Sequence, residues 1–180
     1  MLFLPLSFLF THTFICQQQG IFHLQRAGVC HRDISLENIM IHDGKPVIID
    51  FGIALRVPME RRRLRHLIVP DTDVGKQYYV SPEIALSRDP YDGFAVDLWA
   101  VGVILFIFLT GCPPWSHPFA DLTFELIAIS RNRLESLLVS WDRAVSPEAT
   151  DLLQRMLRLD PRERLSLAQV AEHPWMTMDG

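Results

Sequence analysis

Residues 38–50 read NIMIHDGKPVIID, two short apolar runs on either side of the pair Asp43-Gly44. An Asp-Gly pair between apolar runs is a strong signal for a two-residue turn, so this stretch predicts a β-hairpin with strands at residues 38–42 and 45–50. A chain that folds back at this turn brings Asn38, at the start of the first strand, beside Asp50, at the end of the second.

The two oxygen-bearing side chains at this end of the hairpin predict a metal site. Mg²⁺ takes one or two oxygen ligands from a protein and keeps its other positions for phosphates and water, which suits Asn38 and Asp50. Asp33 lies five residues before Asn38, in the loop that leads into the hairpin. It therefore lies near the predicted metal without having to bind it, and it is free to act on a hydroxyl group.

The composition is that of an ordinary globular protein. The 180 residues are 49% hydrophobic and 21% charged, with a net charge of −4. These values exclude disordered, collagen-like and coiled-coil chains, and the negative charge argues against a nucleic-acid partner. The three cysteines form no Cys-x-x-Cys pair, so we expect neither a zinc site nor a disulfide framework, and we expect a cytoplasmic location.

Two apolar runs raise the question of secretion or a membrane span. Residues 1–16 resemble the core of a signal peptide, but no Lys or Arg precedes them and three glutamines follow, so secretion is the weaker alternative. Residues 98–109 form a run of twelve, fewer than the roughly 18 needed to cross a bilayer, and Asp97 adjoins the run. We expect a buried core helix there and no membrane span.

The chain beyond the hairpin is expected to be mostly helical. Ser146 and Ser166 are typical N-cap residues, and Gly111 follows the long apolar run as a stop signal. We therefore expect a mainly α fold with one small β-hairpin. The predicted helices cover residues 14–25, the run that ends at 110, and residues 121–130, 146–159 and 166–173, with a polar, arginine-rich loop over 56–74.

Five motifs, in order along the chain, resemble those of eukaryotic protein kinases. The catalytic loop of that family resembles HRDISLEN at residues 31–38, and its metal-binding triplet resembles DFG at residues 50–52. The end of the activation segment is similar to SPE at 81–83, and the central helix to DLWAVG at 97–102. The end of the domain is similar to DPRER at 160–164 together with HPW at 173–175. The resemblance is to the serine/threonine branch, nearest the calcium/calmodulin-dependent type, and implies a protein substrate.

The resemblance implies a chemical role for several residues. Asp33 would accept the proton of a substrate hydroxyl, and Asn38 and Asp50 would hold the Mg²⁺ ions that neutralise the phosphates of ATP. Met40 would pack under adenine. Structural roles are implied for His31, Phe51, Gly52, Asp97, Glu83 and Arg164: His31 would stack with Phe51, Asp97 would support the backbone of the catalytic loop, and Glu83 and Arg164 would form a buried ion pair.

The resemblance also implies regulation by phosphorylation. Arg32 precedes the catalytic Asp, as in kinases in which this guanidinium pairs with a phosphate on the activation loop. Thr72 is the candidate for that phosphate, because it is the one Ser or Thr between Gly52 and Val80. An upstream activating kinase would then be a partner. The neighbouring Asp71 and Asp73 are the alternative source of the negative charge.

Two positions depart from the family pattern. Ser35 stands where serine/threonine kinases usually carry Lys, and Lys76 stands where they usually carry Thr. In the family the two side chains meet beside the catalytic Asp, so we interpret the pair as an exchange in which Lys76 supplies the positive charge for the transferring phosphoryl group. The alternative is decay of both positions in an inactive homologue.

The N-terminal lobe of a kinase is expected to be missing from the chain. No two of the nine glycines are spaced as Gly-x-Gly, and neither Lys45 nor Lys76 is placed as the strand lysine of that lobe. We expect an apolar segment of doubtful status at 1–16, a C-terminal kinase lobe at 17–176 and a tail at 177–180. We expect these residues alone to be inactive, and the alternative to a kinase is a non-catalytic, pseudokinase-like binding module.

Overall fold

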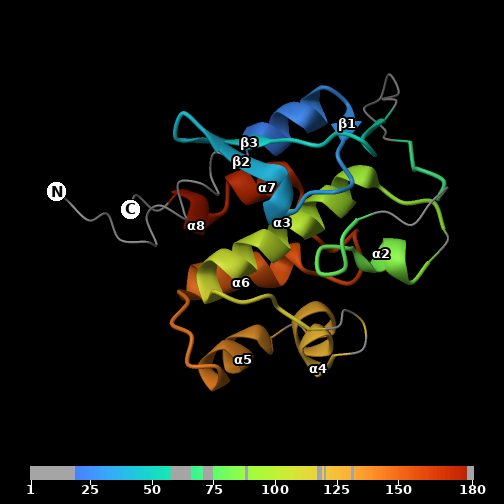
Figure 1. Ribbon diagram of the computed structural model, residues 1–180. Helices are drawn as coiled ribbons and strands as arrows, with labels where there is room; N and C mark the ends of the chain where they lie inside the picture. Colours follow the sequence, from blue (N-terminus) through green and yellow to red (C-terminus); the bar gives the residue numbers. More distant parts are fainter. Residues whose placement is uncertain are drawn as a thin grey trace.

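The computed structural model describes residues 19–57, 66–70, 75–87, 89–116, 119, 121–130 and 132–177. The long helix α3, Gly93–Thr110, runs through the centre of the molecule (Figure 1). It begins after Asp92, whose side chain accepts a hydrogen bond from the backbone N–H of Phe94. It ends at Gly111, which adopts a left-handed conformation with φ of 76°. The predicted central helix and its stop signal are therefore confirmed.

Helix α3 is a core helix. It has the length and the apolar composition of a membrane-crossing helix, since it extends beyond the twelve-residue run to 18 residues, but 78% of it is buried inside the protein. Trp99, Val101 and Ile104 on α3 are fully buried. An added Cβ on Gly102 would lie 3.0 Å from Leu157 Cδ2, so the absence of a side chain there lets the segment after α6 pack closely.

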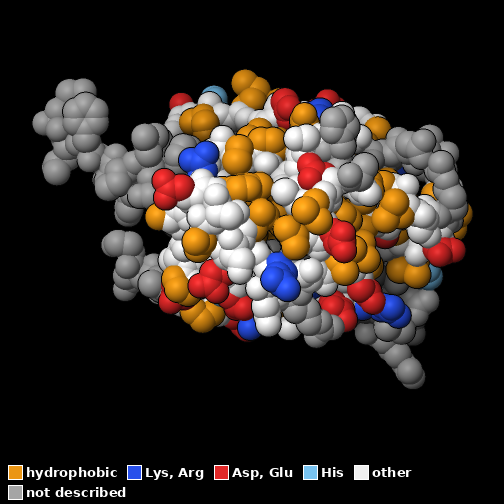
Figure 2. Space-filling view, turned by 90° about the horizontal axis from the view of Figure 1, so that it is seen from below, with side chains coloured by type: hydrophobic (Ala, Val, Ile, Leu, Met, Phe, Trp, Pro, Cys, Tyr) orange, Lys and Arg blue, Asp and Glu red, His pale blue; other side chains and the backbone are white. Residues whose placement is uncertain are grey.

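Shorter helices surround α3, and the described residues 19–26 are also helical. Their bounds are α2, Pro82–Ala85; α4, Leu122–Phe124, continuing as a π-helical turn over Glu125–Ile129; α5, Leu134–Ser140; α6, Pro147–Met156; α7, Leu167–Ala171; and α8, Pro174–Thr177. Helices α4 and α5 lie below α6 in Figure 1. Seen from below, hydrophobic side chains are interspersed with charged ones on the surface (Figure 2).

The predicted hairpin is present. Strands β2, Ile39–His42, and β3, Lys45–Ile48, pair in antiparallel register, with Ile39 opposite Ile48. Both turn residues have positive φ, 49° for Asp43 and 72° for Gly44, as a tight two-residue turn requires. Ile39 and Ile48 pack against the main core, which holds the hairpin on the helices.

Several elements differ from the prediction. Helix α6 ends at Met156 and α7 at Ala171, before the predicted ends at 159 and 173. Residue 177, predicted to begin a tail, is the last residue of α8. A second small sheet pairs β1, Val29–Cys30, with β4, Leu55–Arg56, at the start of the predicted loop. The predicted segment 1–16 and the first residues of the helix predicted from 14 lie outside the described residues.

Candidate active site

A side chain of α3 holds the backbone of the loop between β1 and β2 through hydrogen bonds. Asp97 on α3 is 1% exposed, and its two carboxylate oxygens accept the backbone N–H groups of His31 and Arg32 at 2.7 and 2.8 Å. Arg32 has a φ of 66°, an unusual conformation for a residue with a side chain. Burial raises the pKa of Asp97 to about 7, although both backbone N–H groups act in the opposite direction.

The imidazole of His31 supports the loop that follows the hairpin. Its Nε2 lies 3.0 Å from the carbonyl oxygen of Ile49, and its ring contacts that of Phe51 edge-on, with 4.9 Å between centroids. Burial lowers the pKa of His31 below its usual 6.5, so the ring is mostly neutral at pH 7. The predicted contact between His31 and Phe51 is present.

Asn38 holds the carboxylate of Asp33. The Asn38 amide Nδ2 donates both to the backbone oxygen and to Oδ2 of Asp33, each at 2.8 Å. Asn38 is the last residue of the short 3₁₀ helix Leu36–Asn38, and its carbonyl oxygen accepts the N–H of Ile49 at 2.9 Å. The hairpin therefore joins the loop that carries Asp33 to the segment that carries Asp50.

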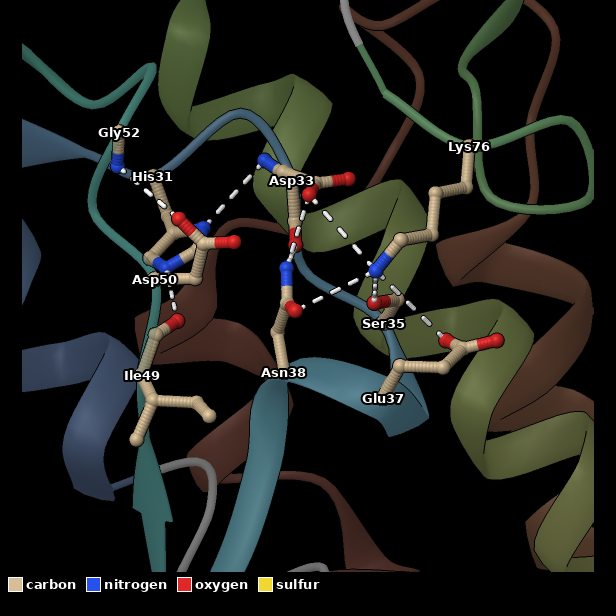
Figure 3. A network of polar contacts seen from close by, with 9 residues as sticks. All are labelled: His31, Asp33, Ser35, Glu37, Asn38, Ile49, Asp50, Gly52 and Lys76. Atoms are coloured by element: carbon tan, nitrogen blue, oxygen red, sulfur yellow. Dashed lines mark hydrogen bonds and ion pairs between the residues drawn. The ribbon is translucent and has the colours of Figure 1, made fainter.

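Asp50 lies on an exposed backbone segment at the end of the hairpin. It has a φ of 64°, and its Oδ1 accepts the N–H of Gly52 at 3.3 Å. Figure 3 shows the side chains of Asp50, Asp33 and Asn38 grouped at this end of the hairpin. The amide nitrogen of Asn38 is bonded to Asp33, and its Oδ1 accepts from Lys76 Nζ at 3.3 Å, which leaves this oxygen a second lone pair. An exposed carboxylate and an oriented amide oxygen are donors that fit Mg²⁺.

Lys76 enters the site from the segment that precedes α2 (Figure 3). Its Nζ donates to Ser35 Oγ at 2.7 Å and to Asn38 Oδ1 at 3.3 Å. The same ammonium lies 3.7 Å from Asp33 Oδ2 and 3.9 Å from Glu37 Oε2. The structure thus brings together the two positions that depart from the family pattern, 41 residues apart in sequence.

Arg32 and Met40 lie at the edges of this cluster. The Arg32 side chain is buried, and its guanidinium donates to the backbone oxygen of Ile53 at 2.8 Å and to the Tyr91 hydroxyl at 3.1 Å. Met40, on β2, is 56% exposed. Thr72, the predicted phosphorylation site, lies outside the described residues.

A buried ion pair connects α2 to the end of the domain. Arg164 donates to both carboxylate oxygens of Glu83 at 2.6 Å, a bidentate arrangement. The Arg164 side chain is 1% exposed and that of Glu83 is 11% exposed. The predicted ion pair is present.

Sequence reasoning did not single out Glu37 or Tyr91. Glu37 lies two residues after Ser35 in the loop between β1 and β2, and this closeness was a signal that could have placed it near Lys76. Tyr91 is 59 residues from Arg32, and its contact arises from the packing of two distant segments. A short local motif gives no signal for such a contact.

Comparison with protein families matches residues 11–176 to the protein kinase domain. The chain belongs to the protein kinase family. It is 36% identical over 160 residues to an Aurora kinase of Yarrowia lipolytica. It is 34% identical over 168 residues to the serine/threonine-protein kinase DCLK3 of Mus musculus, and 35% over 162 residues to the serine/threonine-protein kinase PLK4 of Drosophila grimshawi.

These alignments cover most of this chain and a smaller part of each relative. They include 88%, 90% and 89% of the chain, but 38%, 20% and 19% of the Aurora kinase, DCLK3 and PLK4. The chain therefore spans less than half the length of these relatives.

Proposed function

We propose that the protein is an ATP-dependent protein serine/threonine kinase, with Asp33 as the residue that accepts the proton of the substrate hydroxyl. The observation that carries this proposal is the way the Asp33 carboxylate is held. Asn38 donates to it at 2.8 Å, and the Lys76 ammonium lies 3.7 Å away. A carboxylate oriented in this way can receive a proton without moving.

The residues of the site have separate tasks in this reaction. Asp33 takes the proton as the substrate oxygen bonds to the γ-phosphorus of ATP and ADP leaves. Asn38 and Asp50 would hold Mg²⁺, which when bound neutralises phosphate charge. Met40, exposed on β2, would contact adenine. His31 and Asp97 keep the catalytic loop in place through the contacts described above and do not touch the substrate.

The Asp33→Asn variant tests this role in a form of the protein that also carries an N-terminal kinase lobe, called the full-length protein below. We expect phosphate transfer to a protein substrate to fall by about 10²–10⁴-fold, because the amide cannot accept the proton. Asp43→Asn is the matched control, since it makes the same chemical change at the exposed hairpin turn, where φ of 49° suits Asn. Equal activity of the Asp33→Asn variant and the wild type would contradict the proposal.

We propose different activities for the full-length protein and for residues 1–180 alone. These residues contain no Gly-x-Gly pair to cover the phosphates of ATP, so we propose that by themselves they have negligible turnover. Measurable transfer by the purified 180-residue chain would contradict this part. A full-length protein that folds and binds partners without any phosphate transfer would favour the alternative of a non-catalytic binding module.

Two finer features belong to the same proposal. The ending His173-Pro174-Trp175 supports placement near the calcium/calmodulin-dependent kinases, and the lack of a paired-cysteine motif supports a cytoplasmic location.

We also propose that an upstream kinase phosphorylates Thr72. The Thr72→Ala variant should then lose activation, measured as transfer rate after incubation with the upstream kinase, whereas Ser87→Ala should retain it. Full activation of the Thr72→Ala variant would contradict the assignment.

A further inference from the structure

The candidate active site is rich in negative charge. Asp33, Glu37 and Asp50 all lie on the catalytic loop or at the end of the hairpin. A phosphoryl group brings more negative charge to the same place. A protein cation positioned close to the carboxylates before the reaction begins would offset part of this charge.

The other basic side chains nearby are directed elsewhere. His31 is buried, and its ring faces the carbonyl oxygen of Ile49. The buried guanidinium of Arg32 donates to Ile53 and Tyr91. Lys45 pairs with His42 beside the hairpin turn, at the opposite end of the hairpin from Asn38. Among the residues that the structure describes, Lys76 is the cation with contacts to the oxygens of this site.

Lys76 has a prepared position and remains accessible. Ser35, whose hydroxyl accepts from Nζ at 2.7 Å, is fully buried, so this hydroxyl is a fixed partner for the ammonium. The Lys76 side chain is nevertheless 39% exposed, which leaves it able to face a ligand. Figure 3 shows the ammonium between the Asp33 carboxylate and the Ser35 hydroxyl.

The backbone of Lys76 belongs to a different segment from the catalytic loop. Its carbonyl oxygen accepts the N–H groups of Tyr79 and Val80, both at 2.9 Å, in a turn that precedes α2. Trp115, which is 2% exposed, donates its indole N–H to the carbonyl oxygen of Tyr78 at 3.2 Å. The segment that carries Lys76 is therefore joined to Trp115 through the carbonyl oxygen of Tyr78.

We propose that Lys76 is the phosphate-facing cation of this site, and that the site holds its positive charge only while residues 75–80 are docked. This inference rests on the proposed kinase function and adds a specific catalytic residue to it. Ser35 is a positioning residue, because it acts through Lys76.

Covalent labelling of the full-length protein tests the position of Lys76. The probe is an acyl phosphate of ATP: a lysine amine attacks its acyl carbon, an amide forms, the acyl–phosphate bond breaks, and ATP leaves. We expect Lys76 to be labelled at least about tenfold faster than Lys45, and free ATP to suppress its labelling. Equal labelling of the two lysines, with ATP binding measured separately by fluorescent-nucleotide displacement, would overturn the inference and leave the proposed function standing. Failure to bind ATP would overturn both.

A second variant tests the dependence on the segment. Trp115→Phe keeps an aromatic ring against Trp99, 5.6 Å away between centroids, but removes the N–H bond to Tyr78. We expect slower labelling of Lys76 and unchanged labelling of Lys45. Unchanged labelling of both lysines, in a variant whose circular dichroism matches the wild type, would overturn the proposed dependence on docking.

Exchanging the two side chains tests the charge itself. Lys76→Ser alone should lower turnover by about 10²–10³-fold. The double variant Ser35→Lys with Lys76→Ser restores an ammonium from the catalytic-loop side, and we expect it to recover most of that loss. A Lys76→Ser variant with wild-type turnover, or a correctly folded double variant with no recovery, would overturn the proposal.

Discussion

Asp97 is a single carboxylate that holds the backbone of the loop between β1 and β2. It accepts two N–H groups from consecutive residues, His31 and Arg32, and it lies in an apolar helix at 1% exposure. The hydrogen bonds favour its charged form, whereas burial favours the neutral form and dominates. The residue that orients the loop is therefore also one whose protonation changes near neutral pH.

The raised pKa of Asp97 predicts a pH-dependent stability. Its pKa is 3.8 in an unfolded chain and about 7 here, so between these values the folded protein holds a proton that the unfolded chain has released. The contribution of Asp97 to the free energy of unfolding should therefore be present below pH 4 and decrease by about 4 kcal/mol as the pH rises to 7. Urea unfolding at several pH values between 4 and 7.5 measures this change in the free energy of unfolding.

The Asp97→Asn variant is the control for this pH dependence. His31, with a lowered pKa, contributes a slope of the opposite sign, so the difference between wild type and Asp97→Asn isolates the carboxyl group. The Asp97→Asn variant should be less stable than the wild type at every pH, because its amide offers one acceptor oxygen to the N–H groups of His31 and Arg32. A difference between the two proteins that does not change with pH would contradict the prediction.

At the scale of elements, side-chain caps made two helices, α6 and α7, predictable from the sequence. Ser146 and Ser166 each accept a hydrogen bond from a backbone N–H in the first turn of α6 and α7. Helix α5 begins after Arg133 with no side-chain cap, and it was not predicted. Its buried residues Leu134, Leu137 and Leu138 have helical spacing, but the helix has only seven residues, too few for that spacing to be decisive.

The cap of α7 gives a prediction about the stability of one element. Ser166 Oγ accepts the N–H of Gln169 at 3.3 Å, and the Gln169 side chain accepts the N–H of Ser166 at 2.7 Å. Ser166→Ala should lower the free energy of unfolding by about 1 kcal/mol, whereas Ser166→Asp keeps an acceptor and should retain most of it. Chemical denaturation of the three proteins measures this, and equal losses in the two variants would argue against the cap.

At the scale of the whole molecule, contacts between residues close in sequence could be predicted, whereas contacts between distant segments could not be predicted from spacing. The hairpin fixes the place of Asn38 relative to Asp50 within 13 residues, so the sequence could predict their proximity. The pairing of β1 with β4 and the contact between Arg32 and Tyr91 join segments that only the packed core brings together. The meeting of Ser35 with Lys76 was predictable through the family resemblance, since spacing alone contains no information about it.

The ion pair of Glu83 with Arg164 joins segments 81 residues apart, and its two partners should not be equally important. Arg164 also donates to the carbonyl oxygens of Arg158, Ala95 and Leu159, and its guanidinium lies 4.7 Å from the ring centroid of Trp99. Arg164→Ala should therefore cost about 3–5 kcal/mol, because it leaves Glu83 and three carbonyl groups without this donor.

Glu83→Ala should cost an amount nearer the lower end of about 3–5 kcal/mol, because it leaves a guanidinium that is 1% exposed without its counter-charge but with its carbonyl partners. Urea unfolding of both variants measures the difference. Equal losses would mean that the ion pair alone, and not the wider set of acceptors around Arg164, joins α2 to the end of the domain.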